Sequence, residues 1–179
     1  MDELQISSPA KINLFLEVIA RRPDGYHEIE SVMQLVDLCD RVRLSRMPQG
    51  IEVNVIGAEV PAGPENLAYQ AAALLMQSAG LRGGVRISLE KRIPVSGGLG
   101  GGSSNAGAVL AGLNRLYGLQ YSRQQLQELA AELGSDVPFF LSDGLALAAG
   151  RGEVLMPITP SWSREWVVVA NPRAAISTA

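Results

Sequence analysis

The 179-residue chain contains 47% hydrophobic and 18% charged residues and has a net charge of −3, values ordinary for a soluble globular domain with a real core. No run of Lys and Arg is longer than a pair, such as Arg21-Arg22 or Lys91-Arg92, so the basic stripe of a nucleic-acid binder is absent. The single Cys39 excludes an internal disulfide, and no apolar run is long enough to span a bilayer. Because the first residues also lack the apolar stretch of a signal peptide, we expect a cytoplasmic protein without a membrane partner.

Strands dominate the first third of the predicted structure. The even-numbered positions between Lys11 and Val18 are all aliphatic, which is the period-two pattern of a half-buried strand. Residues 21–25 have the composition of a turn, with Pro and Gly on either side of an Asp. Further strands are expected at 31–38, 41–46, 51–56 and 85–89.

Helices are predicted from clearer signals. Residues 66–79 are rich in Ala and Leu, and residues 104–117 place a stripe of aliphatic side chains on one face before Gly118. Residues 122–125 form a capping box that opens a helix ending at Gly134. Residues 135–138 resemble the cap and first turn of another short helix, and strands are expected again at 145–155 and 165–170. The order of strands, helices and strands predicts an α+β fold.

Residues 94–106, Pro-Val-Ser-Gly-Gly-Leu-Gly-Gly-Gly-Ser-Ser-Asn-Ala, are the most informative part of the chain. Five of the six residues from Gly97 to Gly102 are glycines, so backbone N–H groups can approach a ligand closely. A glycine-rich loop that runs into a helix N-terminus favours an anion, usually phosphate. A flexible linker is the alternative, but the preceding proline and the following amphipathic helix favour a shaped loop.

Three common glycine motifs do not fit this loop. Gly97 and Gly102 have the Walker A spacing, but Ser103 stands where that motif requires lysine. No glycine of the loop is followed by glycines two and five positions later, as the dinucleotide-binding fingerprint requires. The lysine strand, the H-R-D loop and the D-F-G motif of protein kinases are missing. A cation for the phosphates must therefore come from elsewhere in the chain.

The loop resembles the phosphate-binding motif of the GHMP kinases, the superfamily of galactokinase, homoserine kinase and mevalonate kinase. Residues 9–16 and 22–28 are similar to one branch of it, which phosphorylates the 2-hydroxyl of 4-diphosphocytidyl-2-C-methyl-D-erythritol in the non-mevalonate isoprenoid pathway. Residues 133–140 give a third match. The resemblance implies a small-molecule kinase with ATP and Mg²⁺ as cofactors and an α+β N-terminal domain of the ribosomal protein S5 domain 2-like type.

The same resemblance implies a domain division. Residues 1–160 would form the ATP-binding domain, and residues 161–179 would begin a ferredoxin-like C-terminal domain that is mostly missing, so the chain looks truncated. A catalytically weak ATP-binding fragment is therefore the alternative to an active kinase. The sequence leaves the oligomeric state open.

Two residues are expected at the reaction centre. By resemblance Asp136 is the base that accepts the hydroxyl proton, and Lys11 lies near it and offsets developing charge. Lys11 and Asn13 share one face of the first strand, so we expect Asn13 to extend a polar wall toward the substrate. Helix capping by Asp136 and a solvated strand end at Lys11 are the simpler structural alternatives.

The remaining candidate residues bind the two substrates. Tyr26 can stack on a pyrimidine while His27 hydrogen-bonds its polar edge, and the resemblance assigns both to the cytosine. Asn66 and Lys91 match positions that flank adenine, although they would be equally natural as a helix start and a strand end. Mg²⁺ could be held by Ser103 or Ser104. The ATP phosphates are assigned to Pro94, Val95, Ser96, Gly97, Gly98, Leu99, Gly100, Gly101, Gly102, Ser103 and Ser104.

A serine hydrolase is a competing hypothesis. Residues 102–106 approximate a nucleophile elbow around Ser104, and His27 and Asp136 could complete a triad. The chain order His, Ser, Asp is not that of α/β-hydrolases, and no parallel strand pattern precedes the serine.

Overall fold

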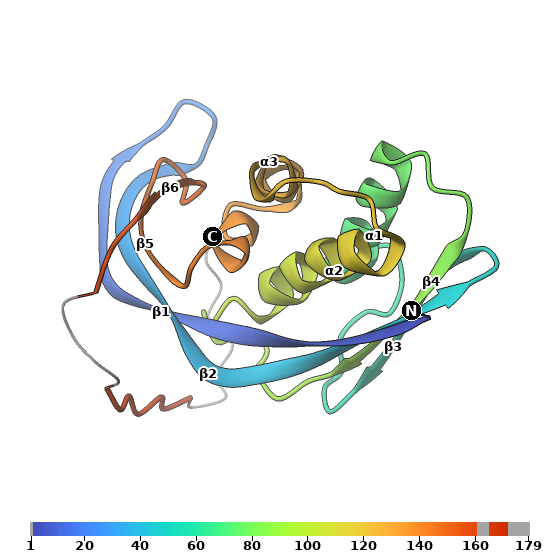
Figure 1. The fold of residues 1–179 in the computed structure, drawn as a ribbon. Helices are drawn as coiled ribbons and strands as arrows, with labels where there is room; N and C mark the ends of the chain where they lie inside the picture. The colour runs from blue at the N-terminus through green and yellow to red at the C-terminus, as the bar shows by residue number, and fades with distance from the viewer. Residues whose placement is uncertain (1, 161–164, 172–179) are drawn as a thin grey trace.

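A six-stranded sheet organises the part of the chain that the computed structural model describes, residues 2–160 and 165–171. The three α-helices and a short 3₁₀ helix cover one face of this strongly curved sheet (Figure 1). The strands are β1 (Glu3–Arg21), β2 (His27–Met47), β3 (Gly50–Ile56), β4 (Gly84–Glu90), β5 (Leu145–Ala149) and β6 (Val154–Pro157). The helices are α1 (Leu67–Ser78), α2 (Gly101–Tyr117), α3 (Arg123–Leu133) and the 3₁₀ helix η1 (Val137–Leu141). The predicted α+β class is confirmed.

Strand β2 holds the sheet together because it has neighbours along its whole length. It pairs antiparallel with β1 throughout, with β5 near its start and with β4 near its end. Strand β3 then lies parallel to β4, and β6 antiparallel to β5. The sequence predicts two strands, at 31–38 and 41–46, where the structure has one continuous strand. The two strands join because Asp40 is buried in the protein interior and is paired with Ser8 in the β1–β2 ladder.

Helix α2 packs against the middle of the sheet and forms the main core with it. The aliphatic stripe predicted for this helix is buried against the inward side chains of β2 and β4. The helix begins at Gly101, three residues before the predicted start, because the last glycines of the loop already take up helical geometry. Its buried stripe consists of Val109, Leu110, Leu113 and Leu116.

The other helices begin where local chemistry predicts. Asn66 caps α1 by accepting a hydrogen bond from the Ala68 N–H, and Ser122 and Gln125 form the complete capping box of α3. The short helix expected at 135–138 is η1, which follows Asp136. Within the described ranges, none of the helices combines the length and apolar character needed to cross a membrane.

Two predicted strands are wrong in the C-terminal region. The expected strand 145–155 is a hairpin of β5 and β6, because Gly150 and Gly152 adopt positive φ and turn the chain. Residues 165–170 have no regular structure, because β-propensity alone does not make a strand without a pairing neighbour. Residues 161–164 and 172–179, which include most of the predicted second domain, lie outside the described residues.

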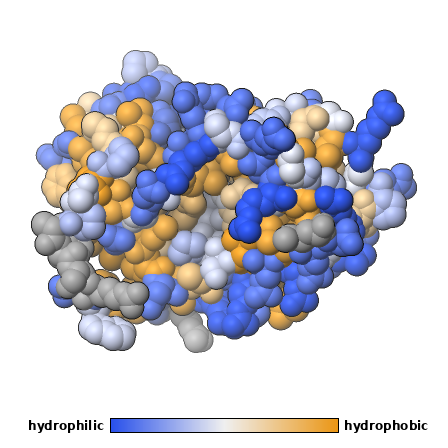
Figure 2. All heavy atoms as spheres, in the orientation of Figure 1, coloured by the Kyte–Doolittle hydropathy of each residue, from blue (hydrophilic) through white to orange (hydrophobic). Residues whose placement is uncertain are grey.

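The first strand is half-buried only as far as Ile12, which corrects the expectation for its second half. Leu14, Leu16 and Val18 are exposed, as is Phe15 on the other face. The β1–β2 hairpin extends past the helices here, and hydrophobic residues gather on the surface where this hairpin and β5–β6 lie (Figure 2). A period-two pattern predicts a strand, but it does not say whether anything covers the apolar face.

Substitution of Gly112 by Val should overpack the interface between α2 and the sheet. A Cβ at this position would lie 2.5 Å from both Ile6 Cδ1 and Leu44 Cδ1. We expect Gly112→Val to lower the free energy of unfolding by ~1–3 kcal/mol, measured by urea denaturation. Arg115→Val, at an exposed position of the same helix, is the control for helix propensity. Equal stability of the two variants would contradict this packing.

Candidate functional site

The loop between β4 and α2 is held in an unusual backbone conformation. Ser96, Gly98 and Gly100 all have positive φ, at 58°, 70° and 68°. Such a conformation is uncommon for a serine and is concentrated at ligand-binding positions. Gly100 is the N-cap of α2 and has no side chain to cap the helix. The N–H groups of the first turn are therefore directed at the space in front of the loop.

A cavity of about 370 Å³ lies in front of this loop. Asn66, Leu67 and Lys91 form its other walls, together with Val60 and Pro61. Of the residues assigned to ATP from the sequence, Ser104 alone is not among the lining residues. The structure therefore brings the remaining predicted residues together around one space.

Ser104 faces the protein interior. The residue is 1% exposed, and its hydroxyl lies 2.7 Å from Ser8 Oγ. Its backbone N–H donates to Gly100 O at 2.8 Å. Both polar groups that could reach a phosphate are thus used internally, whereas Ser103 lines the cavity. The same burial rules out Ser104 as a hydrolytic nucleophile, which removes the serine hydrolase hypothesis.

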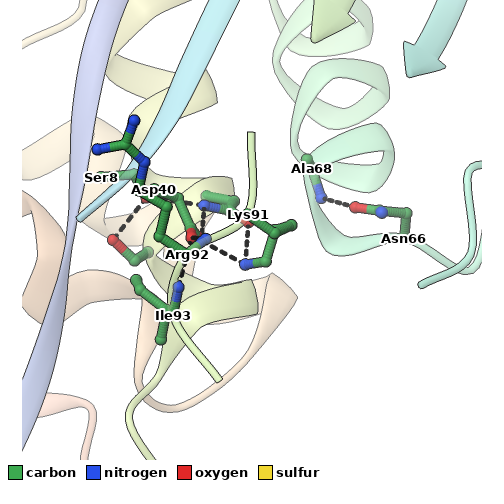
Figure 3. A network of polar contacts seen from close by, with 9 residues as sticks. Ser8, Asp40, Asn66, Ala68, Lys91, Arg92 and Ile93 are labelled. Carbon is green, nitrogen blue, oxygen red and sulfur yellow. Dashed lines mark hydrogen bonds and ion pairs between the residues drawn. The ribbon is translucent and has the colours of Figure 1, made fainter. Parts of the chain in front are cut away.

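Behind the loop, the buried carboxylate of Asp40 binds four donors (Figure 3). Its Oδ1 accepts hydrogen bonds from the backbone N–H groups of Arg92, at 2.6 Å, and Ile93, at 2.9 Å. Its Oδ2 accepts from Lys91 Nζ, in an ion pair, and from Asn105 Nδ2 at 3.0 Å. Asp40 is completely buried. This carboxylate therefore ties the end of β4 and the first turns of α2 to β2.

Asn105 continues the network to the first strand. Its Nδ2 also donates to Ser8 Oγ at 2.9 Å, and its Oδ1 accepts from Lys91 Nζ at 2.9 Å. Sequence reasoning missed Asp40, Asn105 and Ser8. The alternation of the strand could have indicated that Asp40 is buried. Side chains two positions apart lie on the same face, and the apolar Val42 and Leu44 face inward.

The side chains of Asn66 and Lys91 both have structural partners at the cavity wall. Asn66 Nδ2 donates to Pro61 O at 2.6 Å while its Oδ1 caps α1, as Figure 3 shows for the cap. Lys91 is held by Asp40 and Asn105. Both residues thus fill the structural roles left open by the sequence, and their contact with adenine stays a prediction.

Lys11 and Asp136 meet beside the loop. Lys11 Nζ lies 3.6 Å from Asp136 Oδ2, and it donates a hydrogen bond to Asn13 Oδ1 at 2.9 Å. The Lys11 side chain is 8% exposed and that of Asp136 is 37% exposed. Asp136 is the N-cap residue of η1, but its side chain makes no capping hydrogen bond. Helix capping therefore does not explain the position of this carboxylate.

The Lys11–Asp136 pair is fixed against the loop by short contacts. The Lys11 N–H donates to Leu99 O at 3.0 Å. A Cβ at Gly100 would lie 3.1 Å from Lys11 Cγ and 2.6 Å from Phe140 Cζ. The glycine therefore permits a close approach that brings an ammonium group and a carboxylate next to the N-terminus of α2.

Tyr26 and His27 are displayed at the turn between β1 and β2. Asp24 accepts a hydrogen bond from the Tyr26 N–H at 3.1 Å and pairs with Arg22 at 3.1 Å. Partial burial opposes ionisation of Asp24, but these contacts outweigh it and hold its pKa below the usual value. The rings of Tyr26 and His27 are exposed, and Arg151 lies over the tyrosine ring at 4.9 Å from its centroid.

Removal of the Asp40 carboxylate should destabilise the protein far more than loss of an exposed ion pair. Asp40→Ala would leave Lys91 buried without its counterion, and we expect it to lower the free energy of unfolding by ~3–5 kcal/mol. Adding Lys91→Met should recover a large part of this loss. The control is Glu52→Ala, which breaks an exposed pair with Arg86 and should cost ~0–1 kcal/mol. Equal effects in a urea titration would contradict the structural role of Asp40.

Comparison with known proteins finds relatives that share this sequence and fold. Residues 66–144 match the family model for the GHMP kinases N terminal domain. The 4-diphosphocytidyl-2-C-methyl-D-erythritol kinase of Geobacillus kaustophilus (strain HTA426) is 50% identical over 178 residues, 98% of this chain and 61% of that protein. The kinase of the same name from Shouchella clausii (strain KSM-K16) is 52% identical over 97% of this chain and 59% of that protein. This chain therefore spans about three fifths of the length of these curated relatives.

Solved structures agree with the sequence relatives. A crystal structure of 4-(cytidine 5'-diphospho)-2C-methyl-D-erythritol kinase superposes with a TM-score of 0.75 at 46% identity, over 87% of this chain and 55% of that one. The fold also matches homoserine kinase from Cytophaga hutchinsonii, with a TM-score of 0.66 at 21% identity over 83% of this chain and 49% of that one. Residues 66–144, which include the glycine-rich loop and the helix that it opens, therefore match the N-terminal domain of the GHMP kinases.

Proposed function

We propose that this chain is part of a kinase that transfers the γ-phosphate of ATP to the 2-hydroxyl of 4-diphosphocytidyl-2-C-methyl-D-erythritol. The observation that carries the proposal is the Lys11–Asp136 pair, 3.6 Å apart, beside a phosphate loop. The similarity to kinases of that name over nearly the whole chain supports this choice of substrate. Residues 1–160 are proposed as the ATP-binding domain and residues 161–179 as the start of a second domain.

The loop and the first turn of α2 are proposed to hold the ATP phosphates. The cradle fits the group, because positive φ at Ser96, Gly98 and Gly100 and an uncapped helix end provide N–H donors without side chains in the way. Among the described residues, no group of three or more His, Cys, Asp or Glu side chains could hold a metal ion. When bound with ATP, Mg²⁺ would neutralise phosphate charge, and the inward orientation of Ser104 leaves Ser103 as its candidate protein ligand.

The proposed reaction uses Asp136 and Lys11 directly. The substrate 2-hydroxyl oxygen bonds to the γ-phosphorus, the bond from that phosphorus to the β,γ-bridging oxygen breaks, and ADP leaves. Asp136 accepts the hydroxyl proton. Because a carboxylate is a weak base for an alcohol, the proton moves late and positioning matters more than basicity. Lys11 pairs with Asp136 and offsets charge on the transferred group.

The substrate is proposed to extend from this pair to the β1–β2 turn. Asn13, held by Lys11, forms the polar wall between them. The exposed Tyr26 ring stacks on cytosine, and His27 hydrogen-bonds the polar edge of the base. We propose a small-molecule substrate rather than a nucleic acid, and a cytoplasmic location in keeping with the free Cys39.

A nucleotide-binding chain with weak catalysis is the second candidate. The observation that favours it is the coverage of only about three fifths of the relatives' length, together with the exposed apolar face of the β1–β2 hairpin. Both candidates share the same ATP site. They differ in the rate of phosphate transfer by this chain compared with that of a full-length relative.

Nucleotide binding should depend on Gly100 for a reason beyond its positive φ. We expect Gly100→Ala to weaken ATP binding at least tenfold, measured by isothermal titration, because the added Cβ would collide with Phe140 and push the loop from its place. Gly118→Ala is the matched control, since Gly118 has nearly the same φ, 64°, and a Cβ added there would have no atom within 4 Å. Unchanged ATP affinity in Gly100→Ala would contradict the phosphate loop.

Catalysis should depend on the Asp136 carboxylate more than ATP binding does. We expect Asp136→Asn to lower kcat by ~10²-fold or more, because the amide cannot accept the proton. The Kd for ATP should stay within twofold of wild type, a change of less than about 0.4 kcal/mol in binding free energy. Asp143→Asn, which changes an exposed carboxylate paired with Arg123, is the control. Equal rates of ADP formation in wild type and Asp136→Asn would rule out the proposed base.

A further inference from the structure

The turn between β5 and β6 is docked at the start of β2. Gly150 O accepts a hydrogen bond from the Ile29 N–H at 2.8 Å, and the Gly152 N–H donates to Ala149 O at 3.0 Å. The backbone N–H of Arg151 donates to Glu153 Oε2 at 2.7 Å. These contacts fix the backbone of residues 150–153 independently of the Arg151 guanidinium group.

This turn contacts both proposed ends of the substrate site. On one side, the Arg151 guanidinium carbon lies 4.9 Å from the centroid of the Tyr26 ring. On the other side, a Cβ at Gly152 would lie 3.7 Å from Asp136 Oδ1 and 3.7 Å from Ile29 Cδ1. The turn therefore lies between the ring proposed to stack on the base and the carboxylate proposed to receive the proton.

The charge of Arg151 is only loosely neutralised. Its Nε lies 3.5 Å from Glu153 Oε1, a long ion pair, and its side chain is 31% exposed. Arg151 also contributes to the lowered pKa of Asp24, so its positive charge acts on the turn that carries Tyr26. A guanidinium has five N–H donors in a rigid fork that matches phosphate oxygens, and stacking on an aromatic ring leaves the edge donors available.

We propose that Arg151 binds the diphosphate group of the cytidine-containing substrate while it remains stacked on one face of Tyr26. The cytosine takes the opposite face of the ring. This inference rests on the proposed function, because a diphosphate joins the base to the sugar alcohol in that substrate. It adds a binding residue that the sequence motifs did not include.

The probes are cytidine and cytidine 5′-diphosphate, titrated calorimetrically into this chain at low ionic strength. Arg151→Met keeps the apolar stem and removes the charge, and Arg151→Lys keeps the charge and removes the fork. We expect Arg151→Met to weaken binding of the diphosphate about tenfold or more, with less than about threefold change for cytidine. Arg151→Lys should fall between these values. Arg123→Met, which removes an exposed arginine paired with Asp143, should change neither.

The outcomes separate this inference from the proposed function. If the wild-type chain binds both probes and Arg151→Met weakens them by the same factor, or not at all, Arg151 does not bind the diphosphate and the proposed function stands. If the wild-type chain binds neither cytidine nor its diphosphate, the proposed substrate is wrong and the Arg151 inference fails with it.

Discussion

The buried ion pair between Asp40 and Lys91 is the interaction on which the geometry of the proposed nucleotide site depends. Taking two charges out of water costs several kcal/mol for each ion, so the pair persists only because Asp40 also receives two backbone N–H groups and the Asn105 amide. Those donors come from the end of β4 and from α2, while the carboxylate comes from β2. The two ends of the glycine-rich loop are thereby fixed to the sheet, and the loop between them can hold positive φ without side chains.

Because α2 is helical, successive residues of its first turns point in different directions, some into the protein interior and some toward the cavity. Ser104 and Asn105 turn inward, where their polar groups bind Ser8, Asp40 and Lys91. Gly101, Gly102 and Ser103 line the cavity, and Asn105 contributes to its lining as well. A helix that begins with glycines and is capped by no side chain would be a weak start on its own. Here the inward polar residues anchor it from behind, which leaves the N–H groups in front for an anion.

Features set by neighbours in sequence could be predicted, and features set by distant contacts could not. The capping box at Ser122, the stripe of α2 and the shared face of Lys11 and Asn13 follow from local spacing, and each is found in the structure. The Asp40 network joins residues up to 97 positions apart, and the stacking of Arg151 on Tyr26 depends on how a later hairpin docks on β2. The strand expected at 165–170 failed for the same reason, because a strand requires a partner that local pattern does not supply.

The two lysines near the loop differ in how they are held, and this difference bears on how the proposed site would work without a Walker A lysine. Lys91 is held by Asp40 and Asn105 in the interior, so its charge is neutralised at short range and contributes little net field to the cavity. Lys11 is held more loosely, because its carboxylate partner lies 3.6 Å away and is 37% exposed. Only the looser pair can exchange partners during a reaction at small cost. The tight pair fixes the loop to the sheet, and the loose pair is therefore the one that we propose to act on a hydroxyl group and a phosphate.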